Sequence, residues 1–118
     1  MILLTMIFLH IVDDYYLQGI LAQMKQKKFW KEQAPDNLYK YDYIWALIMH
    51  GFSWAFMIML PLIKFRFDYP ISFYGSFIFN AIIHALIDHL KANVKVINLW
   101  TDQLLHMVQI ISTFIMFC

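Results

Sequence analysis

Apolar residues gather along the chain into four long stretches that are separated by short polar segments. The stretches cover residues 2–24, 42–60, 71–90 and 99–118. An α-helix rises about 1.5 Å per residue, so about 20 residues cross the hydrocarbon core of a bilayer. A membrane β-strand needs only about ten residues and alternates with a period of two, which these stretches do not. The pattern predicts an all-α membrane protein with a single domain, 1–118, folded as an antiparallel bundle of four transmembrane helices.

The first stretch fits this description least well. Its continuous apolar run stops near Val12, and Asp13 and Asp14 follow directly. An amphipathic helix lying in the membrane interface is therefore an alternative for this segment. Its start lacks the basic region and the cleavage site of a signal peptide.

The polar connections carry most of the basic residues. Segment 25–41 contains five lysines and the turn-forming Ala34-Pro35-Asp36-Asn37, and we expect a solvated surface loop with some helical character. In segment 91–98, Asn98 is well placed to cap the last helix. Seven of the nine basic residues fall in the first and third connections, which share one side of a four-span protein. The positive-inside rule places that side in the cytoplasm and both termini outside it.

Composition supports a membrane protein and excludes several other classes. Hydrophobic residues make up 62% of the chain and charged residues 14%, against about 25% charged in a typical soluble domain. The net charge of +1 argues against a nucleic-acid partner, which would need clustered basic residues. The single cysteine, Cys118, excludes an internal disulfide and a thiolate zinc site.

Ionisable side chains are unusually frequent inside the predicted spans. All five histidines lie there, as do the acidic residues Asp13, Asp14, Asp88 and Asp102. A carboxylate within a bilayer costs roughly 2.5–3.5 kcal/mol on insertion scales, so such residues are expected to face a bundle interior and to have a function. Among basic residues only Lys91 is placed to pair with them directly, which calls for protons or a bound cation.

Three helices each carry a histidine and an aspartate four residues apart, a spacing that places both side chains on one helix face. The pairs are His10 with Asp14, His84 with Asp88, and Asp102 with His106, and the second helix contributes a single histidine, His50. In an antiparallel bundle these residues meet at one level. Imidazole nitrogen and carboxylate oxygen suit a divalent ion such as Zn, Mn or Fe. The predicted metal ligands are His10, Asp14, His50, His84, Asp88, Asp102 and His106, and the predicted supporting residues are Gln18, Asn80, Lys91 and Gln103.

Other polar residues are expected to lie outside this cluster. His89 and Asp13 are each one position away from a clustered residue, and therefore about 100° around the helix. We expect His89 to pack at headgroup level, Asp13 to face a polar region, and Lys91 to reach the interface. Two alternatives to a metal site remain open for the histidine and aspartate pairs, namely a structural hydrogen-bond network and a proton or ion relay.

Three motifs in this sequence resemble a known family. Residues 10–18 follow H-x3-D-x2-L-Q, residues 84–91 follow H-x3-D-x2-K, and residues 102–106 follow D-Q-x2-H. They are similar to motifs of the bacterial and phage membrane proteins grouped as domain-of-unknown-function family 3307. The resemblance implies a small multi-pass protein of a bacterial or phage-host cytoplasmic (inner) membrane, frequently phage-encoded, and it implies no particular activity.

The leading functional hypothesis is a membrane-embedded, metal-dependent hydrolase. Its substrate would be a lipid-linked or membrane-proximal ester or phosphoester, with Asp14 or Asp88 as the general base. The first alternative is a subunit of a cation, proton or small-solute transporter or channel, which would have to form a homo-oligomer. The second is a phage-encoded interaction protein that contacts a host membrane protein.

Overall fold

The computed structural model describes all 118 residues, and its regular structure is entirely helical. The two central helices are α4 (Asp42–Met59) and α6 (Pro70–His89). The remaining elements are α1 (Ile2–Ile11), the π-helical turn η1 (Val12–Leu17), α2 (Leu21–Met24), α3 (Lys27–Gln33), the 3-10 turns η2 (Asn37–Tyr39) and η3 (Leu60–Leu62), α5 (Phe65–Asp68), the π-helical turn η4 (Leu90–Val94) and α7 (Leu99–Phe117).

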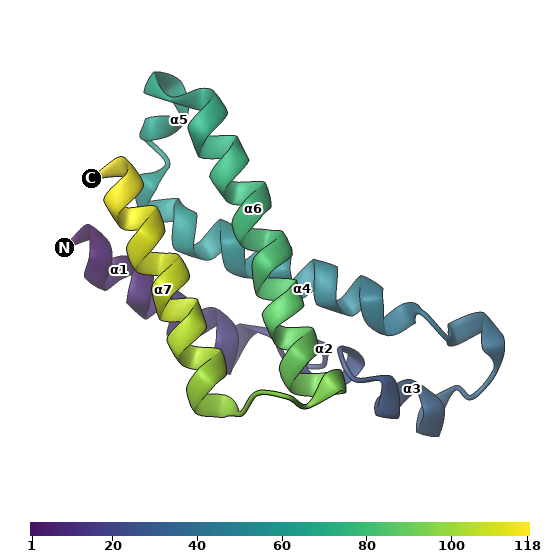
Figure 1. Cartoon of the computed structure of the whole chain (residues 1–118). Helices are drawn as coiled ribbons and strands as arrows, with labels where there is room; N and C mark the ends of the chain where they lie inside the picture. The colour runs from purple at the N-terminus through teal and green to yellow at the C-terminus, as the bar shows by residue number, and fades with distance from the viewer.

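The four longest helices lie together, with α1 beside α4 and α7, and α4 packed most extensively against α6 (Figure 1). The two termini lie near each other, whereas α3 projects from the opposite end of the molecule. The predicted all-α class is therefore confirmed. The Asn98 cap is confirmed too, because its side chain accepts a hydrogen bond from the Thr101 amide over 2.9 Å.

The close contact between α4 and α6 depends on small side chains. A Cβ atom added at Gly51 would lie 2.5 Å from the Ala81 carbonyl oxygen and 3.3 Å from the Ala85 methyl group. Small residues at such positions let two helix backbones approach closely. This approach places His50, which precedes Gly51, next to His84, with 4.9 Å between their ring centres.

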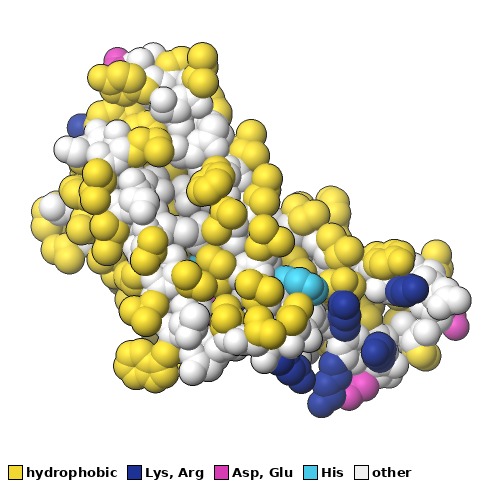
Figure 2. All heavy atoms as spheres, viewed as in Figure 1, with side chains coloured by type: hydrophobic (Ala, Val, Ile, Leu, Met, Phe, Trp, Pro, Cys, Tyr) yellow, Lys and Arg dark blue, Asp and Glu magenta, His cyan; other side chains and the backbone are white.

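The buried residues include an unusually large share of polar and charged side chains. Of the 26 buried residues, 13 are polar or charged, while many large apolar side chains on the long helices are exposed, including Phe8, Phe52 and Phe79. The apolar core is small and consists of Met6, Trp54, Ile58, Met59, Leu62, Phe73 and Ile110. Apolar side chains cover much of the face in Figure 2, and lysines gather at the end where α3 projects.

Two helical stretches, Asn37–Leu62 and Pro70–Val94, are long and apolar enough to cross a membrane. The four-span bundle is therefore supported for only two of its predicted spans. Stretch 2–24 is not one continuous helix, because η1 follows α1 and the chain then turns at Gly19, which has a φ of +51°. The last stretch does form the continuous helix α7, but its inward polar residues lower its hydropathy.

We predict that Gly51→Ala destabilises the protein by about 1–3 kcal/mol, because the added methyl group must push α4 away from α6. Gly75→Ala is the matched control, since its added methyl group meets nothing within 4 Å. This control should be neutral or stabilising by up to about 1 kcal/mol through helix propensity. Denaturant unfolding of the purified protein in detergent measures both, and equal effects would contradict the packing argument.

Candidate metal centre

The predicted histidine and aspartate residues converge from four helical segments into one buried cluster. α1 and η1 supply His10 and Asp14, and α4 supplies His50. The remaining members are His84 and Asp88 from α6 and Asp102 and His106 from α7. Each of these seven side chains is buried. Thus the residues that i, i+4 spacing placed on shared helix faces lie close together in the structure.

Within each predicted pair the two side chains do lie close together. The separations are 3.9 Å between His10 Nδ1 and Asp14 Oδ2, 3.5 Å between His84 Nε2 and Asp88 Oδ2, and 3.3 Å between His106 Nε2 and Asp102 Oδ1. Each of the helices α6 and α7 therefore contributes two potential ligands. The first pair is the loosest of the three.

The centre of the cluster contains polar atoms without hydrogen-bond partners. They include His84 Nε2, His106 Nε2 and Asp102 Oδ1, all buried. A buried polar atom normally finds a partner, and an exception calls for an explanation such as a bound ion. Two ligands held about 2.1 Å from a tetrahedral ion are about 3.4 Å apart. The separations observed around Asp88, 3.5 Å from Oδ2 to His84 Nε2 and 3.4 Å from Oδ1 to His106 Nε2, match that spacing.

Three overlapping groups of three residues have ligand atoms close enough to share an ion. They are Asp14 with His50 and His84, His84 with Asp88 and His106, and Asp14 with Asp102 and His106. The second group contains two of the three unpartnered imidazole nitrogens, those of His84 and His106, and its aspartate faces them with one oxygen each. We therefore regard His84, Asp88 and His106 as the best-placed ligands, with Asp14, Asp102 and His50 around them.

The ring of His106 is oriented for ligation by its neighbour. Its Nδ1 lies 3.2 Å from both Gln109 Oε1 and His84 Nδ1. When the Nδ1 proton is donated to the Gln109 oxygen, the Nε2 lone pair is directed at the cluster. A second hydrogen bond of this kind commonly sets the tautomer of a metal-binding histidine. Gln109 in turn donates to Asn80 Oδ1 over 3.2 Å, which gives the predicted supporting residue Asn80 an indirect role.

His10 occupies a different place from the one predicted. Trp54 Nε1 donates to His10 Nδ1 over 2.7 Å, and His10 Nε2 lies 3.0 Å from Gln103 Oε1. With both ring nitrogens in hydrogen bonds, His10 has no lone pair for an ion and lies outside the three ligand groups. Trp54 follows His50 by four residues, so helix spacing placed it on the cluster face, although its role is apparent only from the structure.

Gln103 and Lys91 support the cluster as predicted, whereas Gln18 does not reach it. Gln103 Nε2 donates to Asp14 Oδ2 and to Asp102 Oδ2 over 3.2 and 2.9 Å. Lys91 Nζ donates to Asp102 over 3.2 Å, so this lysine pairs with a carboxylate, although not with Asp88. Gln18 donates only to the Asp14 carbonyl.

Asp13 is buried in the cluster, so the prediction that it lies outside the cluster is wrong. Ser53 Oγ donates to Asp13 Oδ1, and Asp13 Oδ2 lies 3.7 Å from His50 Nδ1. The reason is the π-helical turn η1, in which the amide of Gln18 bonds to the carbonyl five residues earlier. Because a π-helical turn is wider than an α-helical turn, Asp13 and Asp14 can both face the cluster although they are adjacent in the sequence.

Lys25 was expected in a solvated loop, yet it is buried and donates to Asp88 Oδ2 over 2.7 Å. Asn93 holds this part of the chain in place. Its side chain accepts from the Lys27 amide over 2.7 Å and donates to the Lys25 carbonyl over 2.8 Å. The sequence carried no signal for this contact, because Lys25 and Asp88 are far apart along the chain. His89, as predicted, lies outside the cluster, where it stacks on Tyr43.

The buried charges leave a negative excess at this site. The four carboxylates of Asp13, Asp14, Asp88 and Asp102 are opposed by the ammonium groups of Lys25 and Lys91. With neutral histidines the buried cluster carries two uncompensated negative charges. One divalent cation, or protonation within the cluster, would balance them.

The chain matches no known family profile, no curated protein sequence and no solved structure. The resemblance of its three motifs to a membrane-protein family stays a prediction.

We predict that Lys25→Met destabilises the metal-free protein by about 3–5 kcal/mol, because Asp88 would keep a buried charge without its ammonium partner. Lys28→Met is the matched control. Lys28 is exposed and lies 3.9 Å from Glu32, so its loss should cost no more than about 1 kcal/mol. Thermal unfolding in the presence of a chelator measures both, and similar losses would show that Lys25 is not needed to compensate Asp88.

Proposed function

We propose that this chain is an integral membrane protein that binds one divalent metal ion within the buried cluster. The observation that carries the proposal is the pair of buried, unpartnered imidazole nitrogens of His84 and His106, which face the two oxygens of Asp88 at the spacing of metal ligands. The excess of two negative charges supports a single divalent ion. The mixed nitrogen and oxygen donors favour Zn, Mn or Fe over Mg or Ca.

The chemistry that such a centre supports best is hydrolysis. A bound divalent ion acidifies a coordinated water and polarises an ester or phosphoryl oxygen. Of the two predicted general bases, Asp88 is itself a proposed metal ligand, so Asp14 is the better candidate for this role. Lys25 holds Asp88 at 2.7 Å, while Asp14 accepts from the amide of Gln103. The half-buried Lys91 and Gln103 lie on the outer side of the cluster, which favours a small anionic group reaching it from the surface.

The exposed apolar side chains support membrane insertion beyond the two clearly apolar helices. Large hydrophobic residues point outward on α1 and α7 as well, for example Leu4, Phe8, Leu104 and Ile115. Such extensive exposed apolar surface is unusual for a soluble protein and marks a contact with lipid or another apolar surface. We infer a multi-pass arrangement in which segment 25–41 and the α6–α7 connection face the cytoplasm and both termini face outward.

Cys118 provides a direct test of this topology, because it is the chain's one cysteine and is exposed at the C-terminus. A membrane-impermeant maleimide added to intact spheroplasts should label it. A cysteine introduced at Gln33 in a Cys118→Ser background should react only after the membrane is permeabilised. Labelling in the reverse order would overturn the proposed orientation.

The metal itself is tested by elemental analysis of the detergent-purified protein. We expect about one ion of Zn, Mn, Fe, Co or Ni per chain, because one divalent ion would balance the two uncompensated charges. His84→Ala and Asp102→Ala should lose the ion while helical circular dichroism persists. His89→Ala is the matched control and should retain it, since His89 lies outside the cluster.

Hydrolysis is tested with the same proteins on phosphatidic acid and on a carboxylic ester of matching chain length. The metal-loaded protein should release phosphate or carboxylic acid, His89→Ala should remain active, and His84→Ala should fall to the rate without protein. A protein that binds metal but does not hydrolyse either substrate would contradict the hydrolase proposal and leave the metal-site proposal intact. A protein that neither contains metal after purification nor binds added metal would contradict both the metal site and the hydrolase activity.

A second candidate function, movement of protons or cations, is favoured by one observation. A line of polar side chains leads away from His106 along α6 and α7 through Gln109, Asn80 and Thr113. Such a line inside a helix bundle is typical of a relay. Flux into proteoliposomes without hydrolytic turnover would support this candidate, and an Asn80→Leu variant should then lose flux while retaining metal.

A further inference from the structure

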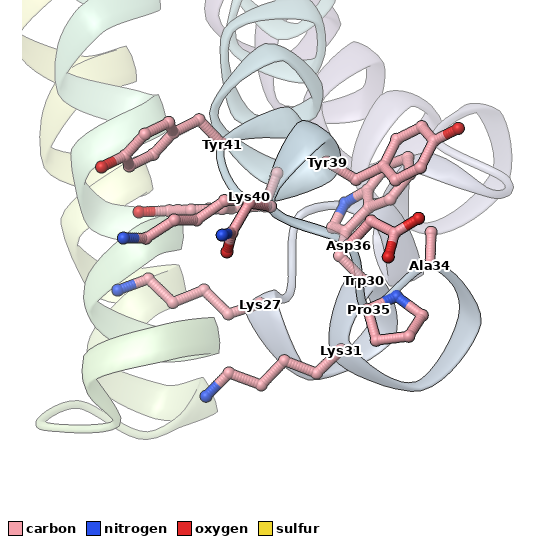
Figure 3. Close-up of a pocket in the computed structure, with 11 residues that line it drawn as sticks. Lys27, Trp30, Lys31, Ala34, Pro35, Asp36, Tyr39, Lys40 and Tyr41 are labelled. Carbon is pink, nitrogen blue, oxygen red and sulfur yellow. The ribbon is translucent and has the colours of Figure 1, made fainter.

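A surface cavity of about 360 Å³ lies between α3, η2 and the beginning of α4, away from the buried cluster. Its walls combine three lysines, Lys27, Lys31 and Lys40, with aromatic residues. Figure 3 shows that the ammonium groups of these lysines extend toward the same side of the cavity. The one acidic residue of the lining, Asp36, directs its carboxylate away from them.

None of the three lysines forms an ion pair within the chain. The lysine pairs that exist involve Lys25, Lys28 and Lys91. Lys27 Nζ lies 5.2 Å from the centre of the Tyr43 ring, and Lys40 Nζ lies 5.4 Å from the centre of the Tyr41 ring. Contacts of this kind hold an ammonium group in place without neutralising it. The cavity therefore presents three ammonium groups without an ion-pair partner and a single carboxylate, so its lining has a net positive charge.

The cavity lies at the end of both helices that are apolar enough to cross a membrane. It adjoins the start of α4, and Asn93 ties Lys27 to η4 at the end of α6. Trp30 and Tyr39 stack beside it, with 6.4 Å between ring centres. Tryptophan and tyrosine are enriched at headgroup depth, where lysine side chains meet lipid phosphates.

We propose that this cavity binds the phosphate group of an anionic phospholipid. The proposal rests on the membrane placement given under Proposed function and is independent of the metal. Charge complementarity identifies the occupant, because three uncompensated ammonium groups at headgroup depth match the phosphate of a lipid with net negative charge. A zwitterionic lipid carries its own cation and offers a weaker complement.

The test compares phosphatidylglycerol with phosphatidylcholine of the same acyl chains. Each lipid is titrated into detergent-solubilised protein, and bound lipid is counted by native mass spectrometry. The wild-type protein should prefer phosphatidylglycerol by about tenfold or more. The triple variant Lys27→Gln, Lys31→Gln, Lys40→Gln should lose that preference.

The matched control is Lys28→Gln, Lys64→Gln, Lys95→Asn, which removes the same charge from exposed lysines outside the cavity. It should retain the preference. Asparagine is used at Lys95 because this residue has a φ of +61°. A triple cavity variant that keeps the preference, a control that loses it equally, or a wild-type protein without any preference would overturn the proposal.

Two further measurements separate the remaining outcomes. Millimolar inorganic phosphate should not displace the lipid, and full displacement would assign the cavity to free phosphate and overturn the lipid as its occupant. Metal content is measured on the same samples and should be equal in all of them. Loss of lipid preference with metal retained supports the cavity, whereas absence of metal throughout contradicts the metal proposal alone.

Discussion

The structure depends above all on the burial of four carboxylates in a small, mostly apolar helical protein. Asp13, Asp14, Asp88 and Asp102 are each at most 8% exposed, and a carboxylate in such surroundings needs compensation from close neighbours. Four histidines, two lysines and several hydrogen-bond donors provide it, and they come from segments distributed over much of the chain. The helices must therefore be held in the positions that bring these groups together, and the packing reflects that requirement.

A close backbone approach between α4 and α6 lies beside the cluster. Gly51 lets α4 reach the Ala81 carbonyl of α6, and this contact places His50 against His84. At the other side, the π-helical turn η1 directs two consecutive aspartates inward, at the cost of a regular first helix. The π-helical turn interrupts a regular helix, and Gly51 lacks a side chain. Both features serve the geometry of the same site. The compensation is nevertheless incomplete, since His84 Nε2, His106 Nε2 and Asp102 Oδ1 keep no partner, and the proposed metal ion would supply one.

The surface of the molecule around the buried site has two distinct regions, one apolar and one basic. Apolar side chains cover the long helices, while uncompensated lysines and stacked aromatic rings gather around α3. An apolar girdle next to a basic, aromatic end is the distribution expected of a protein whose long helices lie in lipid and whose end lies among headgroups. Asn93 connects the two regions, because it fixes the chain between Lys25, which enters the cluster, and Lys27, which lines the cavity. A lipid phosphate bound at the cavity would therefore lie one short segment away from the proposed metal centre.

The sequence by itself determined the helical class, the bounds of α4, α6 and α7 to within one or two residues, and the three histidine and aspartate pairs. These features follow from local rules, since hydropathy sets helix length and a separation of four residues places two side chains on one face. Only the tertiary structure decided the roles of particular residues. Lys25 pairs with Asp88 across the fold, His10 is engaged by Trp54 and Gln103, and Asp13 turns inward through a π-helical turn. Each of these contacts depends on which groups from other segments of the chain pair with a buried charge or hydrogen-bonding atom. Such long-range contacts produce no periodic pattern in the sequence.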